Sequence, residues 1–416
     1  MRIVVAPDSF KESMTSVQAC AAMARGIARV IPDAEIDQAP MADGGEGTMS
    51  VLSAALGAEP RIAVARSPLG DPINAPYSIT SDGCAIIDIA SVVGMALVPP
   101  TERDVMASAT WGVGAVIRAA LDDGAERLLI GLGGSATNDG GAGMVVALGA
   151  RLLDDEGEPV EPTPEGLSRV STVDLAELDP RLSQTRIEAA CDVANPLLGS
   201  DGATAVFSPQ KGGTAETMPV MEAAITRWAA ALSDALGRDC RQAPGAGAAG
   251  GLGFALLMLG GVTRSGIDVV ISATGLDKRI AAADLVLTGE GSLDSQTASG
   301  KAPWGIARVA RRHGVPVIAF AGRVLGGEQS YDAVMPIVPG PIDLATAMRD
   351  GQTNLEHAVV RALRLVTLAH RDPPGACDDP CLDPTSLAVL LPSIAEADHG
   401  DFAATTTIDR LDESEA

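Results

Sequence analysis

Short apolar runs that end in polar, mostly glycine-rich turns recur along this chain, and no other feature constrains its fold as strongly. Such pairs are RIVVA with PDSFKES, RLLIG with LGGSATNDGG, RIEAA with CDVANPLLG, ADLVL with TGEGSLD and PVIAF with AGRVLGG. Helical periodicities follow several of these turns, as in residues 15–31, 253–259 and 304–313. Alternating strands and helices predict an α/β fold with a parallel sheet. Because such sheets bind ligands at the carboxyl ends of their strands, we expect the functional site among these turns.

Residues 59–100 break this pattern, because short strand-like runs follow one another there with no helix between them. They predict antiparallel hairpins in a second domain. We therefore predict a Rossmann-like parallel-sheet domain formed by residues 1–58 and 235–370, with an inserted α/β domain at residues 59–234. Residues 371–416 carry eleven acidic residues, two basic residues and five prolines, which predicts a disordered acidic tail.

The negative charge of the chain restricts the kinds of partner that it is expected to bind. The formal net charge of −24 argues against nucleic acids and anionic membranes as partners, because both bind basic surfaces. No apolar run reaches the roughly 18 residues of a membrane span, and the amino terminus turns polar too soon for a signal peptide. The six cysteines are scattered, apart from one close pair, and form no metal-binding set. We expect a cytoplasmic protein with reduced cysteines that acts on a small molecule.

The stretch GLGGSATNDGGAGM, residues 131–144, contains six glycines directly after a strand-like run. Glycine at this density lets the backbone approach a phosphate closely. The spacing Gly131-x-Gly133-x-x-Ala136, with Asp154 about 20 residues further on, also fits a dinucleotide fingerprint and leaves an NAD-dependent dehydrogenase open. Such a fingerprint runs directly into a helix, whereas TNDGG disfavours a helix start. No histidine is placed to assist hydride transfer, which also counts against this interpretation.

Lysines, histidines and loop carboxylates point to a site for phosphate and metal. The chain has only four lysines, and three of them lie in polar stretches, namely Lys11, Lys211 and Lys301. Lysine binds phosphates and carboxylates as a compact point charge. Since the four histidines lie in or near the tail or at a helix end, we expect a carboxylate as any general base. Loop carboxylates suit Mg²⁺, although each one alone is more typical of an Asx-turn or a helix cap; they are Asp43, Glu46, Asp139, Asp192, Glu290 and Asp294.

These motifs together resemble those of the bacterial glycerate kinase family of the first type. They are APDSFKES, MADGGEGT, GLGGSATNDGGAGM, CDVANPLLG with VFSPQKG, PGAGAAGGLG and TGEGSLDSQTASGKAP, and the resemblance covers residues 1 to about 370. It implies phosphorylation of D-glycerate with ATP and Mg²⁺, usually to 2-phosphoglycerate. The fold that it implies is a Rossmann-like domain with a second α/β domain. Two departures are Glu12, where the family more often has glycine, and the acidic tail.

The resemblance also guides the allocation of roles to residues. We expect the nucleotide phosphates at Gly133, Gly134, Ser135, Thr137, Asn138, Lys211 and Lys301. We expect the substrate at Ser9, Lys11, Asp43 and Glu46, and Mg²⁺ at Asp43, Glu290 and Asp294. Asp192 is the expected general base. Lys11 is the second expected catalytic residue, and we expect Ser9 and Lys11 to hold the glycerate carboxylate or the transferring phosphate. A dehydrogenase, or a non-catalytic sensor of glycerate or nucleotide, are the alternatives.

Overall fold

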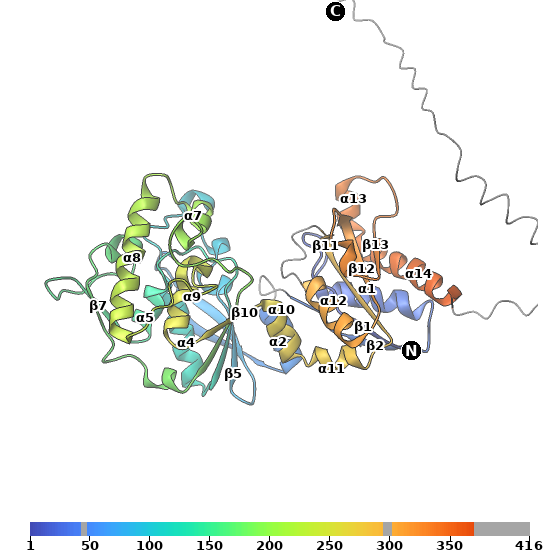
Figure 1. The fold of residues 1–416 in the computed structure, drawn as a ribbon, viewed down its shortest axis with the longest axis horizontal. Coiled ribbons are helices and arrows are strands. Elements are labelled where there is room, and N and C mark those ends of the chain that lie inside the picture. Colours follow the sequence, from blue (N-terminus) through green and yellow to red (C-terminus); the bar gives the residue numbers. More distant parts are fainter. Residues whose placement is uncertain (43–47, 294–301, 370–416) are drawn as a thin grey trace, which may run out of the picture. The chain divides into compact units, whose positions relative to one another are not determined.

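The computed structural model describes residues 1–42, 48–293 and 302–369 (Figure 1). The chain divides into two compact units, Met1–Arg364 and Leu365–Ala416. Only residues 365–369 of the second unit are described, so the predicted acidic tail lies outside the described residues. Within the described ranges, no helix combines the length and the apolar character needed to cross a membrane.

A five-stranded sheet is formed by both ends of the first unit. Its order is β13-β12-β11-β1-β2, and all four pairings are parallel. The strands are β1 (Arg2–Val5), β2 (Glu35–Gln38), β11 (Leu285–Leu293), β12 (Val317–Val324) and β13 (Ala333–Pro336). The helices of this part are α1 (Ser16–Ala28), α10 (Gly266–Ala273), α11 (Leu276–Ala281), α12 (Ala302–His313), α13 (Leu344–Arg349) and α14 (Gly351–Ala369). The predicted Rossmann-like parallel sheet is confirmed.

The first unit also contains a six-stranded mixed sheet. Its order is β10-β9-β6-β5-β4-β3, with antiparallel pairing only among β3, β4 and β5. The strands are β3 (Glu59–Arg66), β4 (Pro72–Ile79), β5 (Cys84–Asp88), β6 (Arg127–Gly131), β9 (Arg186–Ala190) and β10 (Val262–Arg264). The antiparallel strands predicted in residues 59–100 are therefore confirmed, although α3 (Ala90–Val93) and the 3₁₀ turn η1 (Met95–Leu97) also lie in that range.

Helices cover the mixed sheet and enclose an aliphatic core. They are α2 (Thr48–Leu56), α4 (Trp111–Asp122), α5 (Ala142–Ala147), α6 (Pro164–Leu167), α7 (Ala203–Phe207), α8 (Thr217–Leu236) and α9 (Ala248–Met258). A small hairpin adds β7 (Arg151–Leu153) and β8 (Thr172–Asp174), and short 3₁₀ turns here include η2 (Pro100–Glu102), η3 (Pro180–Ser183) and η4 (Pro209–Lys211). Another such turn, η6 (Glu328–Ser330), lies between β12 and β13 of the parallel sheet. The core is mainly alanine, valine, leucine and isoleucine, because aromatic residues are only 2% of the chain. Trp228 and Phe254 are exceptions that are fully buried.

The strand pairing bears on where the inserted domain ends. The sequence placed this boundary at residue 235, but β10 pairs with β9 in the mixed sheet, and Phe254 of α9 belongs to the same core. We propose a boundary near residue 265, which keeps each sheet within one domain.

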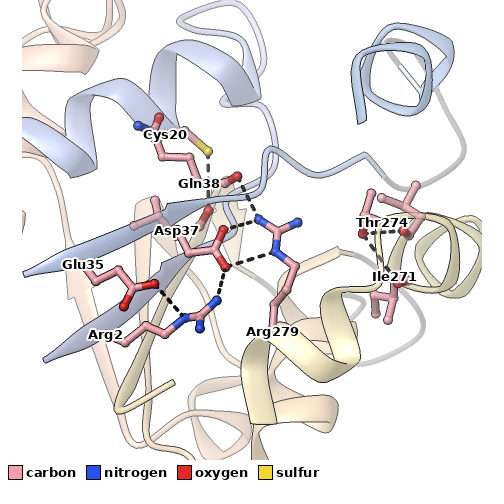
Figure 2. Close-up of polar contacts among 10 residues, drawn as sticks. Arg2, Cys20, Glu35, Asp37, Gln38, Ile271, Thr274 and Arg279 are labelled. Atoms are coloured by element: carbon pink, nitrogen blue, oxygen red, sulfur yellow. Dashed lines mark hydrogen bonds and ion pairs between the residues drawn. The ribbon is translucent and has the colours of Figure 1, made fainter. Parts of the chain in front are cut away.

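An ion-pair cluster joins β2, the edge strand of the parallel sheet, to α11 (Figure 2). Arg279 and Arg2 both donate to the carboxylate of Asp37, Arg279 through Nε at 3.1 Å and Arg2 through Nη2 at 3.2 Å. The hydrogen bond from Arg279 is the largest cause that holds the pKa of Asp37 below its ordinary value. Fully exposed ion pairs contribute about 0–1 kcal/mol, and water screens this half-buried cluster less than it screens such pairs.

Helix α1 begins where the sequence predicts it to begin. The backbone N–H of Gln18 donates to Thr15 Oγ1 at 3.2 Å, and the N–H of Thr15 donates to Gln18 Oε1 at 2.9 Å. This reciprocal pair is a capping box, which satisfies two backbone donors at the helix start. The helix therefore holds the carboxyl end of the preceding loop, which contains Lys11.

Glu12 lies in the same loop with φ of 63°, a left-handed conformation that glycine adopts without steric strain. We expect Glu12→Gly to raise the free energy of unfolding by about 0.5–1 kcal/mol, because relief of this strain exceeds the added entropy of the unfolded chain. Glu12→Val is the matched control and should lower the stability, because β-branched residues tolerate this conformation poorly. Thermal unfolding of the three proteins checks the prediction, which is wrong if the glycine variant melts below the parent.

Candidate active site

The glycine-rich loop follows β6 and is held by the last residue of α3 and the first residue of η1. The N–H of Ala136 donates to the carbonyl of Val93 at 2.8 Å, and the N–H of Met95 donates to the carbonyl of Gly134 at 2.9 Å. The next helix, α5, begins only at Ala142. The loop therefore does not run directly into a helix, as a dinucleotide fingerprint would, in agreement with the interpretation of TNDGG.

Asp139 holds this loop in place from within the core. Its wholly buried carboxylate accepts hydrogen bonds from the N–H and hydroxyl of Thr110, both at 2.7 Å, and from the N–H groups of Gly141 at 3.0 Å and Gly143 at 2.9 Å. Burial raises the pKa of Asp139, and these hydrogen bonds oppose the rise. The sequence left two interpretations of this carboxylate open, a Mg²⁺ ligand and an Asx-turn or helix cap. Its hydrogen bonds to nearby backbone N–H groups correspond to the second.

A second glycine-rich segment, residues 249–251, packs against the glycine-rich loop. Ala249, Gly250 and Gly251 are all left-handed, with φ of 53°, 68° and 85°. The N–H of Gly140 donates to the carbonyl of Gly250 at 2.9 Å. A Cβ atom on Gly250 would lie 2.0 Å from the carbonyl oxygen of Thr137, so the two backbones meet where no side chain fits.

Lys211, in η4, is almost fully buried at 2% exposure and reaches the glycine-rich loop. Its Nζ donates to Ser135 Oγ at 2.9 Å and to the carbonyl oxygen of Thr137 at 2.7 Å. Burial lowers the pKa of Lys211 to about 7, and the charge of Asp139 opposes the shift. A buried ammonium beside a glycine-rich loop is suited to an anionic ligand, whose charge would compensate for the lost hydration.

Lys211 and the loop line a pocket of about 370 Å³, which lies in the size range of small-molecule sites. Its lining combines the loop, the end of β9, the η4 turn and the start of α9. The lining residues are Met95, Leu132, Gly133, Gly134, Ser135, Ala190, Cys191, Asp192, Val193, Phe207, Gln210, Lys211, Ala248 and Ala249. Five of the residues predicted from the sequence therefore meet at one pocket, namely Gly133, Gly134, Ser135, Asp192 and Lys211.

Asp192 is exposed at the pocket and also contacts the beginning of α10. Its Oδ1 accepts hydrogen bonds from Ser265 Oγ at 3.0 Å and from the N–H of Gly266 at 2.9 Å. A carboxylate at this position stabilises the helix start through the helix dipole. Asp192 is thus oriented by α10 while it lines the pocket.

Other predicted residues lie at different places. The side chain of Asn138 donates to Thr204 Oγ1 at 3.2 Å and to Met221 Sδ at 2.7 Å, so it faces α7 and α8. Thr137 is fully buried, and neither it nor Asn138 is among the described residues that line the pocket. Their role in nucleotide binding stays a prediction.

Ser9 and Lys11 follow β1, and Glu290 is buried on β11 at 7% exposure. Tyr331 is also buried, and its burial, followed by the charge of Glu290, raises the pKa of the tyrosine. Four predicted residues lie outside the described residues, namely Asp43, Glu46, Asp294 and Lys301. In the described part of the chain, no group of three or more histidine, cysteine, aspartate or glutamate side chains is arranged to hold a metal ion.

Sequence reasoning missed part of the pocket wall. Met95, Phe207 and Gln210 line the pocket. Phe207 and Gln210 lie within VFSPQKG, so the motif that contains Lys211 could have indicated them. Met95 lies in no recognised motif, and the hydrogen bond from its N–H to the carbonyl of Gly134 places it beside the glycine-rich loop.

Comparisons with known proteins match nearly the whole described chain. Residues 3–367 match the sequence model of the glycerate kinase family. A glycerate kinase of Bacillus subtilis (strain 168) is 45% identical over 363 residues, which cover 86% of this chain and 95% of that protein. A glycerate 2-kinase of Escherichia coli (strain K12) is 41% identical over 362 residues, covering 85% of this chain and 95% of that one. A crystal structure of a glycerate kinase 2 from Salmonella typhimurium LT2 has a TM-score of 0.81 and 41% identity, and covers 90% of this chain and 100% of that chain.

Proposed function

The chain belongs to the glycerate kinase family, and from this premise we propose how its residues carry out the reaction. The activity is phosphorylation of glycerate, and membership of a kinase family implies ATP as the phosphoryl donor. The comparisons give no support to a dehydrogenase or a sensor. We propose D-glycerate as the substrate, 2-phosphoglycerate as the product and the cytoplasm as the location.

One observation carries the assignment of the phosphate site, namely the buried ammonium of Lys211 against the glycine-rich loop. In phosphoryl transfer the protein mainly positions the reactants and neutralises charge. We propose that Gly133, Gly134 and Ser135 receive the ATP phosphates and that Lys211 neutralises them. Lys301, Thr137 and Asn138 complete the proposed nucleotide site.

A direct test of the reaction is ³¹P NMR of the full chain with ATP, Mg²⁺ and D-glycerate. A phosphomonoester signal that requires D-glycerate is expected, and its coupling to carbon-bound hydrogen identifies the phosphorylated hydroxyl. L-glycerate and a sample without substrate are the controls. Coupling to a single hydrogen indicates the 2-phosphate, whereas coupling to a methylene pair would contradict the proposed product.

We propose Asp192 as the general base, with Ser9 and Lys11 binding the glycerate together with Asp43 and Glu46. Asp192→Asn should lower kcat by about 10²-fold, because it removes the proton acceptor. Asparagine retains a carbonyl oxygen that can accept from Gly266, so the start of α10 stays capped. Steady-state kinetics and thermal unfolding of the variant check both statements. Near-normal turnover in a folded variant would remove Asp192 from this role.

For Mg²⁺ we propose Glu290 with Asp43 and Asp294. The donor set fits in its chemistry, because carboxylate oxygens are the ligands that Mg²⁺ takes from proteins, alongside substrate phosphates. Glu290 is buried at 7% exposure, and a cation beside it would compensate for its lost hydration. When bound, the ion would neutralise charge on the ATP phosphates, while Glu290 would hold it in position.

Lys211 also predicts a pH dependence of ATP binding. Its pKa is about 7 in the folded protein, below its ordinary value of 10.5, so the folded chain binds fewer protons than the unfolded chain between these values. The contribution of Lys211 to the free energy of unfolding therefore rises with pH between about 7 and 10.5. Below about pH 7 the cost of burying the charged lysine lowers the stability in full. A bound phosphate favours the ammonium and raises the pKa again, so ATP binding at pH 8 should take up a proton.

Isothermal titration calorimetry checks this proton uptake, using two buffers with different ionisation enthalpies. The observed binding enthalpy should differ between the buffers for the parent protein. The difference should become smaller in Lys211→Met, which has no group to protonate at this position. Equal proton uptake by the two proteins would show that another group, or the nucleotide itself, binds the proton.

A further inference from the structure

Arg103 connects two segments of the pocket wall that are far apart in the sequence. Its guanidinium donates from Nη2 to the carbonyl of Met95 at 3.4 Å and from Nη1 to the carbonyl of Gln210 at 3.1 Å. Nε donates to the carbonyl of Val98 at 3.4 Å. Met95 and Gln210 both line the pocket, so one side chain holds η1 and η4 together.

The backbone of Arg103 makes a second contact with the η4 turn. A Cβ atom on Gly212 would lie 2.8 Å from the carbonyl oxygen of Arg103, so the two main chains lie close to each other. Gly212 follows Lys211 directly, and Gln210 precedes it. Arg103 therefore contacts both neighbours of the buried lysine and fixes the turn from which that lysine enters the pocket.

The charge of Arg103 is not used in an ion pair with any described carboxylate. Among the described residues, no Asp or Glu oxygen lies within 4.0 Å of its guanidinium, whereas Arg181, Arg241 and Arg279 all have such partners. Its hydrogen bonds go to carbonyl oxygens. The guanidinium thus holds two segments of the pocket wall together. It also places a positive charge at a site that we assign to phosphates.

We propose that Arg103 is a positioning residue for ATP binding, which acts by holding the η4 turn so that Lys211 Nζ stays at Ser135 and Thr137. This inference rests on the proposed phosphate site. It assigns to Arg103 an effect on the nucleotide and none on glycerate, because neither of its pocket-lining contacts belongs to the segment with Ser9 and Lys11.

The test measures ATP binding by calorimetry without glycerate, and KM for both substrates, in the full chain. Arg103→Gln should weaken ATP binding about tenfold and leave KM for glycerate within twofold. Arg103→Lys should recover only part of the loss, since an ammonium cannot donate to separate carbonyls as a planar guanidinium does. Arg311→Gln is the matched control, because the acceptors of Arg311 among the described residues are also carbonyl oxygens of a turn, those of Gln329 and Ser330.

A double-variant comparison separates this inference from the proposed function. In the Lys211→Met background, Arg103→Gln should weaken ATP binding no further, because its effect passes through Lys211. Full rescue by lysine, an unchanged ATP affinity in Arg103→Gln, or an equal loss in the Lys211→Met background would each overturn the inference. If Lys211→Met itself leaves ATP binding unchanged, the proposed phosphate site is wrong and the inference falls with it.

Discussion

Replacing Lys211 by methionine is expected to lower kcat/KM for ATP by about 10³-fold. Removal of one preorganised charged donor at a phosphoryl-transfer site typically lowers turnover by 10²- to 10³-fold, and the loss of ground-state binding adds to this. The effect should be large here because the ammonium is 2% exposed, where water screens its charge poorly. Steady-state kinetics with varied ATP measures the loss.

Two further variants make this prediction specific. Lys278→Met is the matched control, because Lys278 is exposed on α11 and should be replaceable without effect. Lys211→Arg should not restore activity, since the larger planar guanidinium does not fit the position of a compact ammonium. Methionine should not destabilise the fold at neutral pH, because it removes a buried charge while keeping the length of the side chain. Normal kinetics in a folded Lys211→Met protein would contradict the proposed site.

Gly250→Ala is expected to lower the free energy of unfolding by more than about 3 kcal/mol. The new Cβ would lie 2.0 Å from the carbonyl oxygen of Thr137, so one of two buried backbones must move. The left-handed φ of 68° adds strain of about 1 kcal/mol. Denaturant unfolding, followed by circular dichroism, measures the change.

Gly237→Ala isolates the strain from the steric contact. Gly237 ends α8 with φ of 64°, and a Cβ atom there would meet nothing within 4 Å. This control should therefore cost only about 1 kcal/mol. If Gly250→Ala and Gly237→Ala destabilise the chain equally, the close approach of the two glycine segments contributes nothing to stability. If Gly250→Ala does not accumulate as folded protein while Gly237→Ala does, the prediction is supported.

The main elements of the fold could be predicted from local sequence patterns, because strands, turns and helix starts depend largely on neighbouring residues. The helix expected in residues 15–31 and the strand Arg127–Gly131 are examples, and both are confirmed. The antiparallel hairpins were also predictable, since turn signals separated the runs. The position of β10 was not, because three residues with no periodicity carry little signal, and their pairing with β9 is a long-range contact.

The residues that line the pocket could be predicted from the sequence only as residue types within motifs. Glycines and Lys211 were recognisable by motif, but their burial and hydrogen bonds depend on packing. Asp139 illustrates the difference, since its motif fitted a metal ligand while its surroundings supply four donors from the chain itself. Arg103 gave no signal at all, because its bonds go to carbonyl groups, which every residue possesses.

The contact between Gly140 and Gly250 also limits how this site can be transplanted. The two residues are 110 positions apart in the sequence, yet their segments lie so close together that there is no room for a side chain on Gly250. A grafted copy of GLGGSATNDGGAGM would therefore lack the surface that shapes it. Protein engineers who wish to move this glycine-rich loop to another scaffold would have to carry both glycine segments, together with α8, whose Trp228 Nε1 donates to the carbonyl of Gly140 at 2.9 Å.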